Sequence, residues 1–138
     1  MAFSIFKESN RVRWSGIRPG VYGEQTLIFA DDIVATALVY TVPVGKVLLL
    51  FNDYFSVRSV AAASTARVYV RDETTAVRGL IAAGSVHAGA SEFVTSTHAR
   101  FVPLELIGGW DIRIVYTLGN AEVWFSAEGL LIDPAENT

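Results

Sequence analysis

The stretch ALVYTVPVGKVLLLFNDYFSV, residues 37–57, decides the fold of this chain. Its first part is rich in β-branched and aromatic residues, which favour strands, and Pro43 then ends the strand. Gly45 can adopt the positive φ that a tight reversal often requires. We therefore predict a hairpin: a strand at residues 34–42, the Pro-Val-Gly-Lys turn, and a long strand at residues 46–57.

The second strand of this hairpin is apolar on both faces. Successive side chains of a strand point to opposite faces, so one face carries Val47, Leu49 and Phe51 and the other carries Leu48 and Leu50. Antiparallel sheets commonly leave one face in water, so a strand of this kind needs a second cover. We predict that the chain's own N-terminal arm or another subunit covers Leu48 and Leu50.

The rest of the chain also reads as short strands. Runs of β-branched, aromatic and alternating apolar residues predict strands, and a further short strand is expected at residues 11–14. In the long strand Asn52-Asp53 is expected to form a bulge or bend, and Pro103 is restricted to an edge or a bulge. The predicted strands are residues 25–30, 66–71, 76–82, 92–96, 100–106, 110–118 and 121–132.

Turn residues separate these segments. Gly119-Asn120 predicts a tight two-residue hairpin, and Gly108-Gly109 predicts a reversal. Asp31-Asp32 and residues 72–75 are expected to be turns, whereas residues 59–65 and 84–91 are expected to be loops. About eight strands, with no helix of even about ten residues, favour an all-β sandwich or barrel.

The composition points to a single domain with little polar surface. The chain has 138 residues, of which 51% are hydrophobic and 18% are charged, against about 25% charged in an average soluble domain. It contains no cysteine, so disulfides and thiolate chemistry are excluded. No secretory signal and no membrane-spanning run of about 18 apolar residues is recognisable. We expect a soluble protein without a cleaved leader, with apolar surface buried between chains.

Charge is distributed unevenly. Residues 1–20 contain four cations and one anion, a net charge of +3, so the remainder carries −6 of the total of −3. This segment also carries several large apolar residues, which free tails rarely do. We predict an extended, docked N-terminal arm at residues 1–23. Its basic residues are either solvated or lie on an acidic neighbouring surface, and binding to nucleic acid is not expected.

No residue set carries recognisable chemistry. The two histidines, His87 and His98, lack the His-x-His spacing of metal sites on strands, so neither a metal nor a cofactor is expected. There is no Gly-x-Ser-x-Gly motif, phosphate-binding loop or calcium loop. Carboxylates that could form a glycosidase pair are interpreted as solvated side chains; they are Asp72, Glu73, Glu105, Glu122 and Glu128. We predict that the chain is not an enzyme, and an enzyme would require a histidine that meets a carboxylate in a pocket.

The aromatic residues are the remaining candidates for a binding site. Trp124 shares a strand face with Glu122 and Ser126. Aromatic faces can stack on sugar rings, so a carbohydrate-binding surface is an alternative to core and interface packing. The aromatic residues considered are Trp14, Trp110, Trp124, Tyr69 and Tyr116.

Three segments resemble the small jelly-roll proteins of tailed bacteriophage virions, especially trimeric capsid decoration (cement) proteins and related head or tail-fibre modules. They are the Val-Pro-Val-Gly-Lys turn at residues 42–46 with the strand after it, PLELIGG at residues 103–109 leading into WDIRI, and the last strand ending in AEGLL at residues 127–131. The similarity spans residues 34–132. It implies an all-β, single-domain antiparallel jelly-roll sandwich at residues 24–133, preceded by the arm and followed by a polar tail at residues 134–138.

The resemblance further implies a structural role on a capsid surface. The protein would form homotrimers, bind the major capsid protein or another virion protein, and be made in the host cytoplasm. The alternative is a carbohydrate-binding or fibre module that mediates attachment to a glycan. Candidate interface residues are Phe3, Phe6, Arg11, Arg13, Trp14, Leu48, Leu50, Trp110 and Trp124.

Overall fold

The computed structural model describes residues 11–14, 21–33, 36–59, 63–87, 93–118 and 121–134. Within them the chain forms nine strands and no α-helix. The strands are β1 (Arg11–Trp14), β2 (Val21–Ile33), β3 (Ala37–Thr41), β4 (Val47–Ser59), β5 (Ser64–Arg71), β6 (Val77–Val86), β7 (Phe93–Ile107), β8 (Asp111–Leu118) and β9 (Ala121–Ile132).

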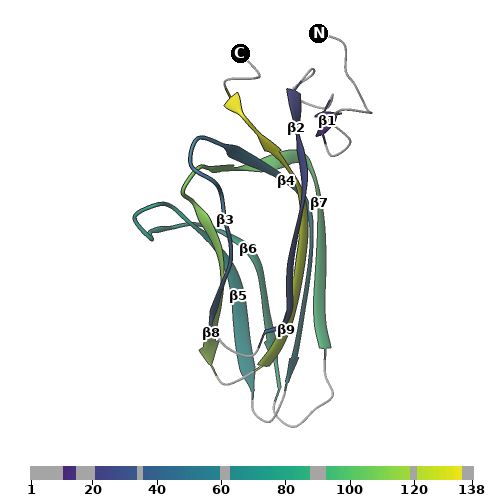
Figure 1. Cartoon of the computed structure of the whole chain (residues 1–138). Helices are drawn as coiled ribbons and strands as arrows, with labels where there is room; N and C mark the ends of the chain where they lie inside the picture. Colours follow the sequence, from purple (N-terminus) through teal and green to yellow (C-terminus); the bar gives the residue numbers. More distant parts are fainter. Residues whose placement is uncertain are drawn as a thin grey trace.

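The strands form two packed antiparallel sheets (Figure 1). One has the order β1-β2-β9-β4-β7 and the other has the order β3-β8-β5-β6. The pairs are nested: β5 pairs with β6, β4 with β7, β3 with β8 and β2 with β9. A long antiparallel ribbon that is wrapped into two sheets in this way is a jelly roll. The predicted all-β jelly-roll sandwich is therefore confirmed.

Two predicted hairpins are wrong. β3 and β4 follow one another through the turn at Gly45 but lie in different sheets, and the same is true of β8 and β9. In a jelly roll most strands that are consecutive in sequence lie on opposite layers, so a tight turn connects the two sheets. Of the described strands, only β1 with β2 and β5 with β6 are both consecutive and paired.

The two glycine turns have the predicted reversal geometry. Gly45 has a φ of 82°, and Lys46 N donates to Pro43 O at 3.1 Å. Gly109 has a φ of 90° and occupies the corresponding position between Ile107 and Trp110. A positive φ at the third residue defines a type II turn, for which glycine is the suitable residue. Hydrogen bonds between Val42 and the Gly109-Trp110 segment fasten the two turns together.

Several predicted boundaries differ from the structure. Asp31-Asp32 is not a turn but an irregularity inside β2, where the register with β9 shifts. Residues 84–86 continue β6 instead of starting a loop. Residues 92–96 and 100–106 do not form separate strands, because β7 runs continuously with a bulge that contains Pro103. A bulge near Asn52-Asp53 is confirmed, since the β4 register shifts between Leu50 and Asn52.

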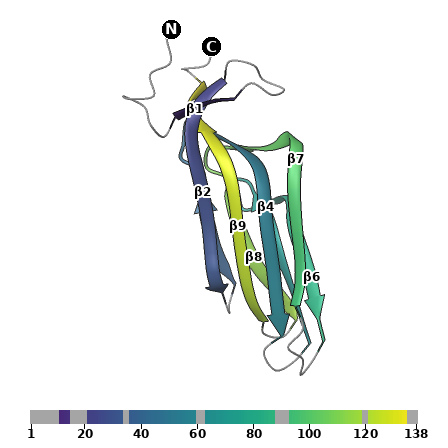
Figure 2. The same ribbon diagram turned by 90° about the vertical axis from the view of Figure 1, so that its right-hand side faces the viewer.

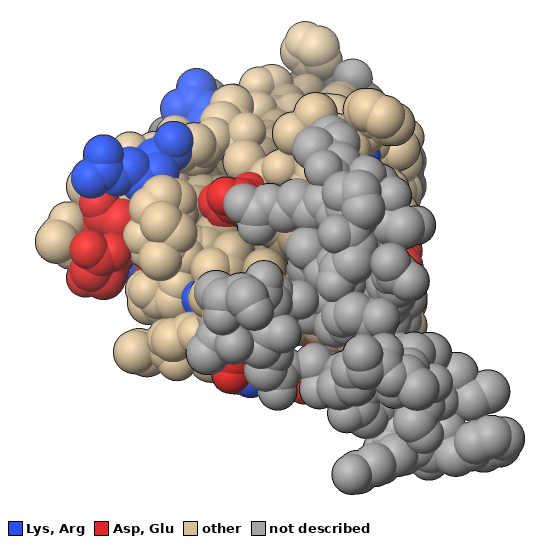
Figure 3. Space-filling model, turned by 90° about the horizontal axis from the view of Figure 1, so that it is seen from above, with Lys and Arg blue, Asp and Glu red and all other residues tan. Residues whose placement is uncertain are grey.

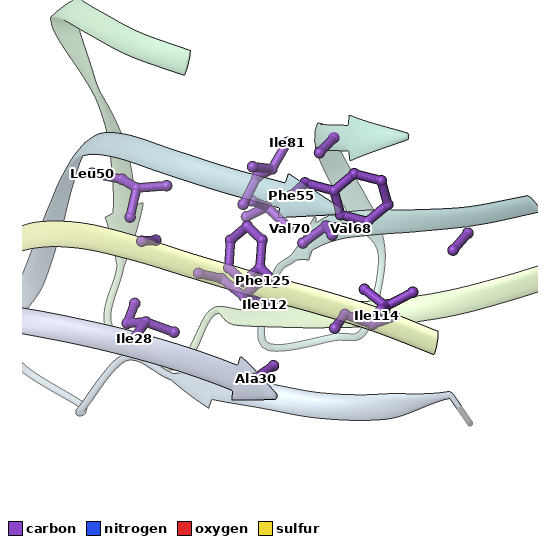
Figure 4. Close-up of a cluster of buried hydrophobic side chains, with 14 of the residues drawn as sticks. Ile28, Ala30, Leu50, Phe55, Val68, Val70, Ile81, Ile112, Ile114 and Phe125 are labelled. Carbon is purple, nitrogen blue, oxygen red and sulfur yellow. The ribbon is translucent and has the colours of Figure 1, made fainter. Parts of the chain in front are cut away.

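The core lies between the two sheets (Figure 4). Phe55 and Phe125 are opposite each other on β4 and β9 and are almost completely buried. Leu48 and Leu50 also belong to this core and have no exposed surface. Their predicted place on an outer face is therefore wrong, and they cannot contact another subunit. The residues drawn around this core include Ile28, Ala30, Val68, Val70, Ile81, Ile112 and Ile114.

The opposite face of β4 carries a second apolar cluster. Leu49 is fully buried there together with Leu130 and Ile132 of β9, and Val47 and Phe51 pack beside them. The prediction of a strand that is buried on both faces is thus correct, with the two faces interchanged. The sequence Leu-Leu-Leu-Phe gives no indication of which residues point inward, because all are apolar.

Candidate functional site

An open groove crosses the outer face of the five-stranded sheet, the face that is turned to the viewer in Figure 2. Its volume is about 410 Å³. Phe29 of β2 borders one side of the groove and is 70% exposed. Leu27 and Tyr54, which also line the groove, are exposed as well. Such a row of large apolar side chains on one sheet face commonly marks an interaction site. The lining residues are Leu27, Phe29, Asn52, Asp53, Tyr54, Thr97, His98, Ala99, Ser126, Ala127 and Glu128.

A carboxylate with two amide partners fixes the polar part of the groove. Glu128 of β9 accepts a hydrogen bond from Gln25 Nε2 at 3.2 Å and one from Asn52 Nδ2 at 3.4 Å. Because the three residues come from β2, β9 and β4, the network crosses three neighbouring strands. The groove therefore presents aromatic and aliphatic side chains beside a polar group held in a defined orientation.

A second, smaller hollow of about 310 Å³ adjoins the groove around Trp124. The guanidinium carbon of Arg58 lies 5.8 Å from the centre of the Trp124 ring, within the range of a cation–π contact. Arg58 also forms an ion pair with Glu122, which is on the same face of β9. The predicted grouping of Trp124, Glu122 and Ser126 on one face is confirmed by the burial pattern of β9, with Val123 and Phe125 directed to the core.

The edge strand β7 carries a highly exposed aromatic residue, Phe101. Between Leu50 and Asn52, a single β4 residue opposes residues 100–103 of β7, so these four residues bulge out of the sheet. Phe101, in the bulge, is 86% exposed, and Val102 beside it is also exposed. The bulge thus forms an apolar projection at the edge of the sheet.

A buried carboxylate holds this bulge against β4. The Asp53 side chain has no exposed surface, and its Oδ1 lies 2.8 Å from His98 Nδ1. Its Oδ2 accepts a hydrogen bond from Arg100, the first residue of the bulge. Burial of a carboxylate is tolerated when it is paired and hydrogen-bonded, as here. The Asp53 cluster, defined as Asp53, His98 and Arg100, therefore sets the position from which Phe101 projects.

The Asp53 cluster bears on the enzymatic alternative, which requires a histidine paired with a carboxylate. His98 meets this condition and lines the groove. A serine, Ser96, precedes it by two residues, but its buried hydroxyl forms no hydrogen bond with any described residue. The other histidine, His87, is exposed at the end of β6. Absence of enzymatic activity remains a prediction.

Among the other carboxylates considered as catalytic candidates, Asp72 has several structural partners. Asp72 is buried rather than solvated: it accepts hydrogen bonds from Thr74 and from the backbone amide of Ala76, and it forms an ion pair with Arg78. Hydrogen bonds, first of all from the Thr74 hydroxyl, lower the pKa of Asp72 to about 2. They also hold Thr75 at a φ of 68° in the β5–β6 turn. Within the described part of the chain, no group of three or more potential metal ligands is present.

The predicted interface residues have different positions in the structure. Phe3 and Phe6 lie outside the described residues, whereas Arg11, Arg13 and Trp14 form β1, whose side chains are not described. A strand at residues 11–14 is confirmed. Trp110 is half-buried against the core and is not a free surface platform. Trp124 lies on the outer face beside the groove.

Sequence reasoning missed the exposed residues that make this surface. Leu27 and Phe29 alternate with the buried Ile28 and Ala30, and a run that is apolar at every position does not reveal its outer face. Phe101 was expected in an ordinary strand. No local pattern identifies the Asp53 cluster, because Asp53 and His98 are 45 residues apart in the sequence and meet only when their two strands pair.

Comparisons with known proteins give no family. No protein-family model matches the chain, and no curated protein matches it. No helix of the described residues is long and apolar enough to cross a membrane.

Three similar solved structures differ widely in their biology. A pilus chain of Bacillus endospore appendages is 10% identical, with a TM-score of 0.38, 80% of this chain covered and 85% of that one. A chain of infectious bursal disease virus is 13% identical, with a TM-score of 0.34 and coverages of 88% and 37%. The Clostridium thermocellum xylanase 10B CBM22-1–GH10 modules are 14% identical, with a TM-score of 0.29 and coverages of 91% and 24%. These TM-scores are below 0.5, so the fold assignment rests on the strand order of the chain itself.

Proposed function

We propose that this protein is a non-enzymatic structural component of a virion: a jelly-roll decoration (cement) protein that acts as a homotrimer on a capsid surface. The observation that supports this most is the group of large apolar side chains left exposed on one sheet face and its edge, above all Phe29 and Phe101. On the end of the molecule seen in Figure 3, most of the described atoms belong to residues other than Lys, Arg, Asp and Glu. An apolar surface with little charge is suited to permanent contacts between chains.

The proposed mechanism involves no chemical reaction and consists of contacts between chains. Each copy buries apolar surface against its neighbours and against the capsid, and several weak contacts made by one oligomer add up to firm attachment. The Phe101 projection is suited to such a contact, because the Asp53 cluster binds the side chains of His98 and Arg100 and thereby fixes the segment from which Phe101 projects. A segment that is already ordered loses less conformational entropy when it binds.

Sedimentation and shell binding test this proposal. The chain should sediment as a trimer and bind capsid shells of the virus that encodes it. Phe101→Ser should weaken trimerisation or shell binding by about 30-fold or more, the effect of losing an interface residue worth about 2 kcal/mol. Leu80→Ser is the matched control, because Leu80 is an exposed apolar residue on β6 of the other sheet.

The proposal is overturned if the protein is a monomer that does not bind shells. Equal effects of the Phe101 and Leu80 substitutions would leave no special role for the β7 edge. Circular dichroism of both variants verifies that they fold.

Attachment to a glycan is a second candidate, and the groove favours it. Tyr54 and Trp124 are aromatic residues on the outer face, and Glu128 is held beside the groove by two amides, a combination that could stack on a sugar ring and bind its hydroxyls. A glycan array tests this directly. Tyr54→Ala and Trp124→Ala should abolish any signal, whereas Trp110, which packs against the core, is not an informative position.

A further inference from the structure

The outer face of the four-stranded sheet carries a row of side chains that crosses all four strands. Residues directly opposite each other on neighbouring strands point to the same face. The pairing places Arg113 of β8 between Leu38 of β3 and Tyr69 of β5, and it places Leu80 of β6 on the other side of Tyr69. Leu38 and Leu80 are each 55% exposed. This face, here called the platform, is therefore open to solvent.

The platform is positively charged. Arg67 and Arg71 flank Tyr69 along β5 and point the same way, and Arg67 Nη1 donates to the Tyr69 hydroxyl at 3.4 Å. Arg71 donates to Asp111 through Nε at 2.9 Å and Nη2 at 2.6 Å, so these two charges cancel. Together with Arg113, three arginines and one aspartate leave a net charge of +2. The platform is defined as Leu38, Arg67, Tyr69, Arg71, Leu80, Asp111 and Arg113.

The groove face, which is the outer face of the five-stranded sheet, has the opposite charge. Glu128 lines the groove, Glu122 lies on the same face of β9, and Glu105 is opposite Leu49, whose side chain belongs to this face. Arg58 is opposite Glu122 and forms an ion pair with it. The ion pair of the Asp53 cluster adds no net charge. Three glutamates and one arginine therefore give the described side chains of this face a net charge of −2.

Both faces also expose large apolar side chains. Leu27 and Phe29 of the groove face are 59% and 70% exposed, and the platform exposes Leu38 and Leu80. Every cation of the platform is an arginine, and arginine and tyrosine are enriched in protein interfaces whereas lysine is depleted. The two faces thus match in charge sign and in apolar content, as contacting protein surfaces do.

We propose that the platform of one copy docks on the groove face of a second copy, with Arg67 and Arg113 directed at the carboxylates around Glu128. Figure 2 looks onto the groove face, and the platform is on the far side of the sandwich. A contact between two different faces is heterologous, and because these faces lie on opposite sides it continues from copy to copy without closing.

This inference rests on the proposed function in one respect: in that role the contact joins neighbouring trimers on the shell and not the copies within one trimer. Leu80→Ser therefore remains a suitable control for trimer formation. A second copy that docks on the groove face also excludes a glycan from the groove.

A single contact of this kind is weak. Four strands about 4.8 Å apart, with eight residues of about 3.3 Å each as in β5, form a face of roughly 500 Å². A standard interface buries about 800 Å² on each partner. Sedimentation of the full chain should therefore be followed up to about 1 mM protein and at low ionic strength, where the charges are little screened.

Charge reversal on each face, alone and together, tests the contact. The platform variant is Arg67→Glu/Arg113→Glu, the groove variant is Glu105→Lys/Glu128→Lys, and the swapped variant carries all four substitutions. The control is Glu73→Lys, a charge reversal in the exposed β5–β6 turn and on neither sheet face. Circular dichroism verifies that each variant folds.

The average mass of the wild type and of the control should rise continuously with concentration beyond that of the closed oligomer. The platform variant and the groove variant should each weaken this association about 10-fold or more, because like charges then face each other. The swapped variant restores opposite charges and should recover to within about three-fold of the wild type.

The inference is overturned if the mass of the wild type does not rise, if either double variant associates like the wild type, or if the swapped variant does not recover. Loss of shell binding by the platform variant, with self-association unchanged, would also overturn it and would assign the platform to a capsid protein. Trimer formation and shell binding of the wild type are read separately, so a failure of this contact is distinguishable from a failure of the proposed function.

Discussion

Replacing Asp53 by asparagine is expected to lower the free energy of unfolding by about 2 kcal/mol. The carboxylate is fully buried and accepts hydrogen bonds from His98 and Arg100. Asparagine keeps one acceptor oxygen for Arg100, and its NH2 group can donate to His98 when that ring takes the tautomer with an unprotonated Nδ1. A hydrogen bond to a charged group contributes about 1.5–3 kcal/mol and a neutral one about 1 kcal/mol, so removing the charge costs on the order of 1 kcal/mol for each of the two bonds. Asparagine keeps the shape of the side chain, which excludes a cavity as the cause.

Asp53→Ala should cost more, because Arg100 and His98 then lose their acceptor. Breaking a fully buried ion pair costs about 3–5 kcal/mol. Water can partly replace the carboxylate here, since the side chains of Arg100 and His98 are 20% and 43% exposed. We therefore expect a cost near the lower limit, about 3 kcal/mol.

Urea unfolding at neutral pH measures these effects. With a slope of about 2 kcal/mol per molar urea, a loss of 2 kcal/mol lowers the midpoint by about 1 M. Hydrogen exchange should also accelerate at the amides of residues 98–102, because the bulge is no longer held against β4. Glu122→Gln is the matched control: it removes the charge of a partly exposed ion pair, in which the side chains of Arg58 and Glu122 are 39% and 21% exposed, and such a pair contributes about 1 kcal/mol.

The reasoning is refuted if Asp53→Asn leaves the midpoint unchanged, or if it and Glu122→Gln have the same effect. Either result would mean that the Asp53 cluster does not hold the bulge. A loss of stability without faster exchange in residues 98–102 would show that Asp53 stabilises the fold but does not position Phe101.

Three further predictions concern the turns and the core. Gly129→Ala should lower the free energy of unfolding by about 1–3 kcal/mol, because the new Cβ would lie 2.8 Å from Leu48 Cδ1. Gly79 has open space around it, so Gly79→Ala is the control and should leave stability unchanged. Similar urea midpoints for the two variants would contradict this prediction. The pKa of Asp72 is lowered from 3.8 to about 2, so its stabilisation is complete above pH 4 and lost as the pH falls toward 2. The difference in urea midpoint between wild type and Asp72→Asn should shrink over that range, and a constant difference would exclude the titration. Thr75→Gly should raise the urea midpoint, because glycine adopts a φ of 68° without strain; the expected gain in the free energy of unfolding is about 1 kcal/mol. A lower midpoint would show that the turn tolerates threonine without strain.

The all-β class and most strand positions could be predicted because they depend on local patterns. The alternation in β8 and β9, the positive φ of Gly45 and the confinement of Pro103 to an edge strand are each properties of a few neighbouring residues. Strand partners could not be predicted in this way. The turn at Gly45 looks the same in sequence whether it joins two strands of one sheet or two strands of different sheets.

The candidate site was predicted less well, for the same reason. Trp124 was placed on the correct face because its neighbours on β9 alternate clearly between polar and apolar. Leu48 and Leu50 were assigned to the wrong face because every residue from Val47 to Phe51 is apolar. The residues after this run do not reveal the inward face either, since the bulge between Leu50 and Asn52 changes the phase of the alternation. The Asp53 cluster depends on the pairing of β4 with β7, which only the folded chain reveals.

The nested pairing of strands has a consequence for how this protein is made. β9 is the last of the described strands in chain order, yet it lies in the middle of its sheet, between β2 and β4. Until residues 121–132 are available, these two strands have no partner between them, and the apolar faces that they turn to the core are unprotected. The β5–β6 hairpin, closed by the hydrogen bonds of Asp72, can form early because its contacts are local. The remaining pairs must close progressively longer loops, so folding is expected to be slow and to be completed only after β9 has been synthesised.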